Sequence, residues 1–262
     1  MSPDDAIAVF DSGFGGLTVL QAITDLLPKE NTFYFADTAH LPYGNKGKET
    51  ILRYCLENAS FLKRQNIKLL VIACNTACCC ALEEVRKEIC IPVIGITEVA
   101  VQEVLTLLPI HRVGILGTRA TIASGFYQTE LSKKSPSIQL FPLACPLFVP
   151  LVEEGYIEHA ITDQVIGEYL LPLKRHVLDG LLLGCTHYPL LTPAIRRIVG
   201  PDMMLIDPAA ACARRVKKLL EEQGLLNQQL EQGRTTFFST DDPEQFRRIG
   251  QSFLKNEIVF SQ

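Results

Sequence analysis

Short apolar runs alternate with helical patterns along almost the whole chain, and this alternation limits the fold more than any other feature. Runs typical of buried strands cover residues 7–10, 32–35, 69–73 and 92–95. A stretch with a helical pattern follows each of the first three runs. Strands that alternate with helices in this way predict an α/β fold, in which helices cover both faces of a mostly parallel sheet.

The pattern restarts near residue 98. The strand and turn at 112–118 parallel those at 7–13, and the apolar run at 181–184 parallels the run at 69–73. The same elements in the same order predict two related α/β units. A last strand, at 235–240, has no counterpart in this count, and we expect it to return to the first unit. The predicted domains are therefore 1–97 plus 210–262, which is discontinuous, and 98–209.

Charge and cysteine content exclude several classes of protein. A net charge of −4 gives no general attraction to nucleic acid or to an anionic membrane. No apolar run approaches the roughly 20 residues that span a bilayer. An odd count of nine cysteines in a chain of 262 residues fits a reducing cytoplasm better than a disulfide framework. Cysteines cluster at 74–80, but the spacing is not that of a zinc site.

Two cysteines stand apart because each ends a buried strand in nearly the same local sequence. Cys74 follows the run at 69–73, and Cys185 follows the run at 181–184. The residues after them are short hydrogen-bonding groups at an expected helix start: Asn75, Thr76, Thr186 and His187. A helix N-terminus favours a thiolate. Two facing thiols could take a proton from one face of a carbon and return one to the other face.

Other polar residues are expected at the same edge. In an open α/β sheet, ligands bind beyond the carboxyl ends of the strands, where Asp11, Asp37 and Thr118 also fall. The glycine-rich turn at 11–16 lacks the lysine of a phosphate-binding loop and the glycine spacing of a dinucleotide fold. Its free N–H groups suit a carboxylate. Asp11 could bind an ammonium group, tune a thiol or only cap a helix.

Two interpretations of Glu153 stay open, whereas the remaining seven cysteines have one. Glu153 closes an apolar run and is either a solvated helix residue or an accessory acid/base group. The other cysteines are interpreted as small apolar packing residues: Cys55, Cys78, Cys79, Cys80, Cys90, Cys145 and Cys212.

Four motifs, in this order, closely resemble those of the bacterial glutamate racemases, within the cofactor-independent aspartate/glutamate racemase superfamily. They are Asp11-Ser12-Gly13-x-Gly15-Gly16, Pro42-Tyr43-Gly44, Ala73-Cys74-Asn75-Thr76-Ala77 and Gly184-Cys185-Thr186-His187-Tyr188-Pro189. The resemblance runs from the first strand to the stretch near Phe246. It implies two pseudo-symmetric α/β domains with the active site between them. It also implies interconversion of L- and D-glutamate with no pyridoxal phosphate, metal or nucleotide.

The resemblance also assigns roles to residues. It implies that Cys74 takes the α-proton of D-glutamate and that Cys185 takes that of L-glutamate. The implied substrate-binding residues are Asp11, Ser12, Tyr43, Gly44, Asn75, Thr76, Thr186 and His187. The implied accessory residues are Glu153, Thr118 and Thr121. Members of the family supply D-glutamate for peptidoglycan and commonly dimerise, so a bacterial cytoplasmic enzyme and a homodimer are further expectations.

Two departures and two alternatives accompany this interpretation. Cysteines at 78–80 replace the small residues usual in the family, and Asp207-Pro208-Ala209 stands where a serine commonly follows the aspartate. The nearest alternative is an aspartate racemase or another paired-cysteine isomerase, since one sequence does not reveal the length of the pocket. The other is a small-ligand binding protein that has lost turnover.

Overall fold

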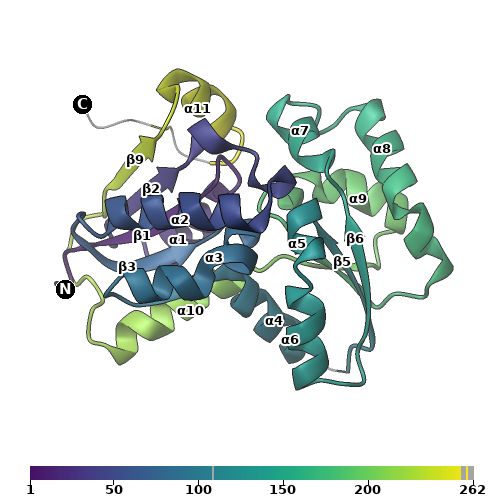
Figure 1. Ribbon diagram of the computed structural model, residues 1–262, viewed down its shortest axis with the longest axis horizontal. Helices are drawn as coiled ribbons and strands as arrows, with labels where there is room; N and C mark the ends of the chain where they lie inside the picture. The colour runs from purple at the N-terminus through teal and green to yellow at the C-terminus, as the bar shows by residue number, and fades with distance from the viewer. Residues whose placement is uncertain (108, 255–257, 259–262) are drawn as a thin grey trace.

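Two α/β lobes, each built on one parallel sheet, make up the protein (Figure 1). The computed structural model describes residues 1–107, 109–254 and 258. The strands of the first sheet are β1 (Ala6–Asp11), β2 (Thr32–Ala36), β3 (Ile67–Ile72), β4 (Val93–Gly95) and β9 (Thr235–Ser239). Those of the second are β5 (Arg112–Gly117), β6 (Gln139–Ala144), β7 (Gly180–Gly184) and β8 (Met204–Ile206). The predicted α/β class is confirmed.

Helices cover the sheets. The α-helices are α1 (Leu17–Leu26), α2 (Lys48–Leu62), α3 (Asn75–Glu88), α4 (Ile96–Thr106), α5 (Arg119–Ala123), α6 (Phe126–Lys134), α7 (Phe148–Glu153), α8 (Ala160–Leu170), α9 (Thr192–Val199), α10 (Ala209–Glu222) and α11 (Pro243–Gly250). In the first lobe α2 packs on α3, and α1 packs on α10 (Figure 1). Among the helices in the described ranges, none combines the length and apolarity that a membrane span requires.

The two sheets share one topology. The strand orders are β4-β3-β1-β2-β9 and β6-β5-β7-β8. β1 lies between β2 and β3 as β5 lies between β6 and β7, while β4 and β8 lie outside β3 and β7. β9 is the extra strand, and it pairs in parallel with β2 of the first sheet. This pairing supports the domain division 1–97 plus 210–262 and 98–209, which we keep as a proposal.

The central strands are buried on both faces, which explains why their sequences are unbroken apolar runs. Every residue of β3 and of β7 is buried. Lys68 lies within β3 and is also fully buried, but its ammonium group pairs with Glu30 at 2.5 Å and donates to the carbonyl oxygen of Leu225 at 2.9 Å. A buried charge needs such partners to offset its lost hydration.

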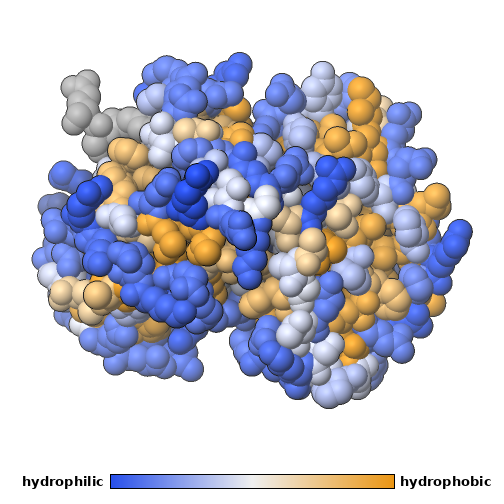
Figure 2. Space-filling model, in the orientation of Figure 1, coloured by the Kyte–Doolittle hydropathy of each residue, from blue (hydrophilic) through white to orange (hydrophobic). Residues whose placement is uncertain are grey.

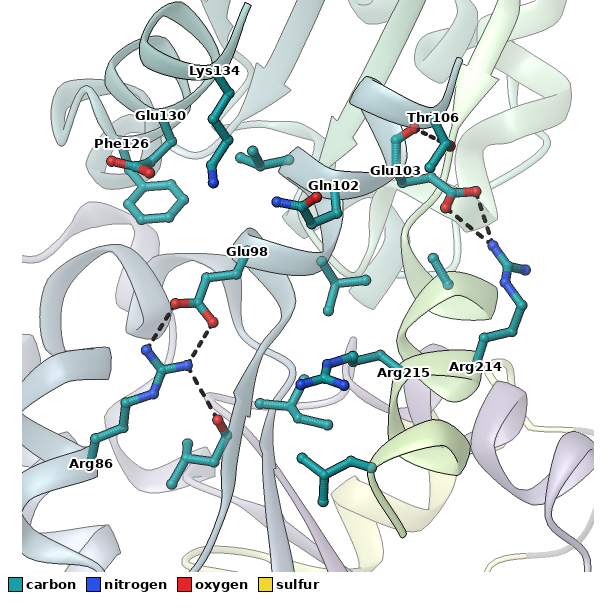
Figure 3. A pocket seen from close by; sticks show the side chains of 16 residues that line it. Arg86, Glu98, Gln102, Glu103, Thr106, Phe126, Glu130, Lys134, Arg214 and Arg215 are labelled. Atoms are coloured by element: carbon teal, nitrogen blue, oxygen red, sulfur yellow. Dashed lines mark hydrogen bonds and ion pairs between the residues drawn. The ribbon is translucent and has the colours of Figure 1, made fainter. Parts of the chain in front are cut away.

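Two ion pairs join α4 to helices of the first lobe (Figure 3). Arg86 of α3 holds Glu98 of α4 at 2.8 and 2.6 Å, and Arg214 of α10 contacts Glu103 of α4 at 3.1 Å. They border a cavity of about 440 Å³, and the space-filling outline is indented between the lobes (Figure 2). The described residues that line this cavity include no cysteine, so the predicted site lies elsewhere.

Candidate active site

Cys74 lies where β3 ends and α3 begins. Its sulfur accepts a hydrogen bond from the backbone N–H of Ala77 at 3.5 Å, so Cys74 is the N-cap of α3, as expected. The hydroxyl of Ser12 lies 3.4 Å from the same sulfur. Burial raises the pKa of the Cys74 thiol and the charge of Asp11 raises it further, while the bonds from Ser12 and Ala77 lower it. These two hydrogen bonds are the contacts that favour the thiolate.

Cys185 directly follows β7, but no α-helix begins beside it. The expectation of a helix start is wrong here: a turn leads into a short 3-10 helix at Tyr188–Leu191, and α9 begins only at Thr192. Pro189 and Pro193 give the physical reason, because each fits only the first turn of a helix. One continuous helix from 186 would place Pro193 in its interior. In the turn that replaces such a helix, Nδ1 of His187 lies 3.9 Å from the sulfur of Cys185.

His187 is held between the thiol of Cys185 and the carboxylate of Glu153. Its Nε2 donates to Oε1 of Glu153 at 2.9 Å, and its side chain is 6% exposed. Burial lowers the pKa of His187, but the hydrogen bonds and charges of Cys185 and Glu153 outweigh it and raise this pKa to about 10. The imidazole is therefore positively charged at neutral pH. Glu153 ends α7, and its carboxylate faces His187 across this hydrogen bond.

Asp11 connects the end of β1 to the second lobe. One carboxylate oxygen accepts from the N–H of Gly13 at 2.9 Å, and the other accepts from the hydroxyl of Thr186 at 3.4 Å. Burial raises the pKa of Asp11, and the charge of His187 is the largest effect that opposes it. Asp11 thus lies behind the glycine-rich turn, where it orients both the turn and Thr186.

Three threonine hydroxyls form a triangle across the lobes. Thr76 is the second residue of α3, whereas Thr118 and Thr121 belong to the start of α5. The oxygen of Thr76 lies 2.9 Å from that of Thr118 and 3.1 Å from that of Thr121, and the last two are 3.0 Å apart. The hydroxyls that were predicted separately therefore form one polar cluster.

Side chains outside the motifs support the cleft. Tyr43 donates its hydroxyl hydrogen to the buried carboxylate of Asp37 at 2.5 Å. The position of Asp37 at the end of a strand had indicated that it lies near the cleft. Tyr127 donates to the side-chain oxygen of Asn75 at 2.5 Å, and no sequence signal indicated this contact. The cleft also has an apolar wall that was not predicted, formed by Leu41, Pro146, Val149 and Pro150. Three of these residues, Pro146, Val149 and Pro150, belong to the apolar run before Glu153, which could have indicated this wall.

One cavity of about 70 Å³ gathers most of the predicted residues. Those that line it are Ser12, Tyr43, Gly44, Cys74, Asn75, Thr76, Thr118, Glu153, Cys185, Thr186 and His187. Asp11 and Thr121 lie behind the lining and contact it through Thr186 and Thr76. The two thiols come from different lobes and are close enough for a charge on Cys185 to raise the pKa of Cys74.

The other cysteines are free, and most are buried. The packing interpretation is wrong for Cys90, which is exposed, and Cys79 is only partly buried. Cys90 lies in the bend after α3, where its side chain is exposed to solvent. In the described ranges no group of three or more His, Cys, Asp or Glu side chains is arranged to hold a metal ion.

Known proteins resemble the chain over nearly its full length. It is 44% identical to a glutamate racemase of Geobacter metallireducens, over 98% of this chain and 95% of that protein. A glutamate racemase of Francisella tularensis, crystallised with D-glutamate, superposes with a TM-score of 0.93 at 37% identity, covering 98% and 96% of the two chains. One from Thermus thermophilus, with β-chloro-D-alanine, gives a TM-score of 0.88 at 40% identity, covering 100% and 98%.

The fold and the cleft define a two-lobed α/β isomerase with its site between the lobes. A family model described as Asp/Glu/Hydantoin racemase matches residues 15–216. The chain therefore belongs to the Asp/Glu/Hydantoin racemase family, and the resemblance noted from its motifs is confirmed.

Proposed function

We propose that the protein is a glutamate racemase, which interconverts L- and D-glutamate without a cofactor and supplies D-glutamate for peptidoglycan synthesis. The observation that carries the proposal is that Cys74 and Cys185, one from each lobe, line a single cavity. The likeness to glutamate racemases at 44% and 37% identity supports glutamate over aspartate as the substrate.

The two thiols act as a pair of acid/base groups. The thiolate of Cys74 takes the α-proton of D-glutamate, and that of Cys185 takes the α-proton of L-glutamate. As the S–H bond forms, the electron pair of the broken C–H bond moves toward the α-carboxylate. The opposite thiol then gives its proton to the other face of the carbon. No electrons are lost, and each turnover exchanges the thiol and thiolate states of the pair.

Donors around the cleft stabilise the charge that develops on the α-carboxylate. Asn75 and Thr76 lie beside Cys74, and Thr186 lies beside Cys185, so donors accompany both thiols. Fixed donors in a site that excludes water are worth more than the same groups in bulk solvent. Ser12, Tyr43, Gly44 and His187, which line the cavity, and Asp11 behind them complete the substrate-binding set in this proposal.

The cellular setting follows from the same proposal. Nine free cysteines and the absence of a membrane-spanning helix among the described residues are compatible with a reducing cytoplasm, where we place the reaction. A homodimer is proposed by analogy with the family, and size-exclusion chromatography with light scattering tests it.

Racemisation in D2O tests the proposed function. L-glutamate incubated with the protein without added cofactor is expected to lose its optical rotation and to gain deuterium at the α-carbon. L-aspartate under the same conditions is expected to keep its rotation. Loss of rotation with aspartate alone would assign the chain to the aspartate racemases. No change with either acid would favour a binding protein and reject the proposal.

Glu153→Gln is expected to make the activity more sensitive to alkaline pH. His187 has a raised pKa of about 10, so its charge is present at neutral pH and is lost as the pH rises through about 10. Without the carboxylate, this pKa falls, and the positive charge of the imidazolium beside Cys185 is lost at lower pH. The alkaline limb of kcat/KM for L-glutamate should move down by about one pH unit.

Glu154→Gln is the matched control, because Glu154 is the neighbouring glutamate and its side chain is exposed. Its pH profile should overlay that of the wild type. An unchanged alkaline limb in Glu153→Gln would show that Glu153 does not set the charge of His187.

A further inference from the structure

The hydroxyl of Tyr127 reaches from one lobe into the other. Tyr127 belongs to α6 and is fully buried. Its hydroxyl donates to Oδ1 of Asn75, at the start of α3, at 2.5 Å. Figure 1 shows α3 and α6 in different lobes. A buried phenol normally finds a partner, and here the partner is the residue that directly follows Cys74 and lines the cleft.

The contact decides which end of the Asn75 carboxamide faces the cleft. Oδ1 is bonded to Tyr127, whereas Nδ2 has no acceptor among the described residues. A flipped carboxamide would take the acceptor away from the phenol, whose proton has no other partner in the described ranges. A buried donor left without an acceptor is costly. The hydroxyl of Tyr127 therefore keeps a free N–H donor, and not an oxygen, available to an anionic ligand.

We propose that Tyr127 is a positioning residue for the racemisation reaction, acting through Asn75. This inference rests on the proposed function, in which Asn75 donates to a carboxylate of glutamate. Without the hydroxyl, the carboxamide is free to turn its oxygen toward that carboxylate, and the two oxygens repel each other. The donor is then lost for a fraction of the time, and transition-state stabilisation falls with it.

The ring of Tyr127 has a separate packing role that a phenylalanine keeps. A Cβ placed on Gly184, the last residue of β7, would lie 3.4 Å from Cε2 of Tyr127, so the ring packs beside this strand. Tyr127→Phe thus removes the hydrogen bond and retains the aromatic surface. This separation makes the hydroxyl testable by itself.

A double-mutant cycle tests the proposal. Tyr127→Phe is expected to lower kcat/KM for L-glutamate by about tenfold, the size expected for a single hydrogen bond. Asn75→Ala should lower it at least as much. The double variant should be no slower than Asn75→Ala, because Tyr127 has no effect once its acceptor is gone. An equal loss in both backgrounds, or no loss in the single variant, would overturn the proposal.

Tyr188→Phe is the matched control. Tyr188 is also fully buried in the second lobe, but its hydroxyl donates to the main-chain carbonyl of Cys145 at 2.9 Å. Any loss of kcat/KM that Tyr188→Phe causes should be the same in the wild-type background and in the Asn75→Ala background. Thermal melting of each variant identifies any loss that comes from folding. Wild-type protein that does not racemise glutamate would reject the proposed function, whereas additive losses in an active enzyme reject only the role of Tyr127.

Discussion

Cys185→Ala is expected to lower the racemisation rate by about 10³-fold or more, because one of the two proton carriers is gone. Cys74→Ala should lower the racemisation rate by a similar factor. Both sulfurs line the cavity and neither is one of the donors assigned to the α-carboxylate, so the binding of glutamate should remain close to that of the wild type. The measurements are polarimetry for turnover and isothermal titration calorimetry for binding. A Cys185→Ala variant that racemises at the wild-type rate would end the two-thiol mechanism.

The two variants should differ in which enantiomer they label in D2O. Cys185→Ala keeps Cys74, so it should exchange the α-proton of D-glutamate without inversion, and Cys74→Ala should do the same with L-glutamate. NMR of the α-position measures the deuterium uptake of each enantiomer with both variants. Cys212→Ala is the control for loss of a buried thiol, because Cys212 is fully buried in α10 outside the cleft, and it should keep wild-type turnover. The opposite labelling pattern would exchange the roles of the two cysteines.

The fold could be predicted because its central strands are buried on both faces. Such strands need unbroken apolar runs, and parallel strands need a crossover, so the alternation of runs and helices carries the topology. The return of the chain to β9 was also predictable, since the strand at 235–239 had no counterpart in the second unit. The bounds of helices were harder to predict, as the region after Cys185 shows, where two prolines break the expected helix.

The candidate site was predictable only where local sequence carries the chemistry. Cys74 and Asn75 could be found because strand, cap and helix start are neighbours in the chain. The partner of Asn75 could not, because Tyr127 lies in the other lobe and nothing in its local sequence differs from a packing residue. The bond from His187 to Glu153 likewise depends on how α7 packs beside the second cysteine. Contacts between lobes follow from packing, which a single sequence does not display.

Gly15→Ala is expected to lower kcat/KM by about 10²-fold, the cost of displacing a reacting group by about 1 Å. Gly15 does not have a positive φ, so the reason for glycine here is space. A Cβ at this position would overlap with Oγ1 of Thr186 and Nδ1 of His187, and it would lie 2.8 Å from Cε1 of His187. The methyl group must therefore push Thr186 and His187 away from the first lobe, and Cys185 loses its imidazolium partner.

Gly47→Ala separates this effect from the general cost of replacing a glycine. Gly47 precedes α2 with φ −71° and ψ 154°, and a Cβ there meets no atom of the described residues within 4 Å. Its kinetics should match those of the wild type. The displacement in Gly15→Ala should also show in the pH profile, because His187 moves relative to both Cys185 and Glu153 and its pKa falls. Full activity with an unchanged alkaline limb would mean that the lobes can separate without cost, and the close approach of the glycine-rich turn would then have no part in catalysis.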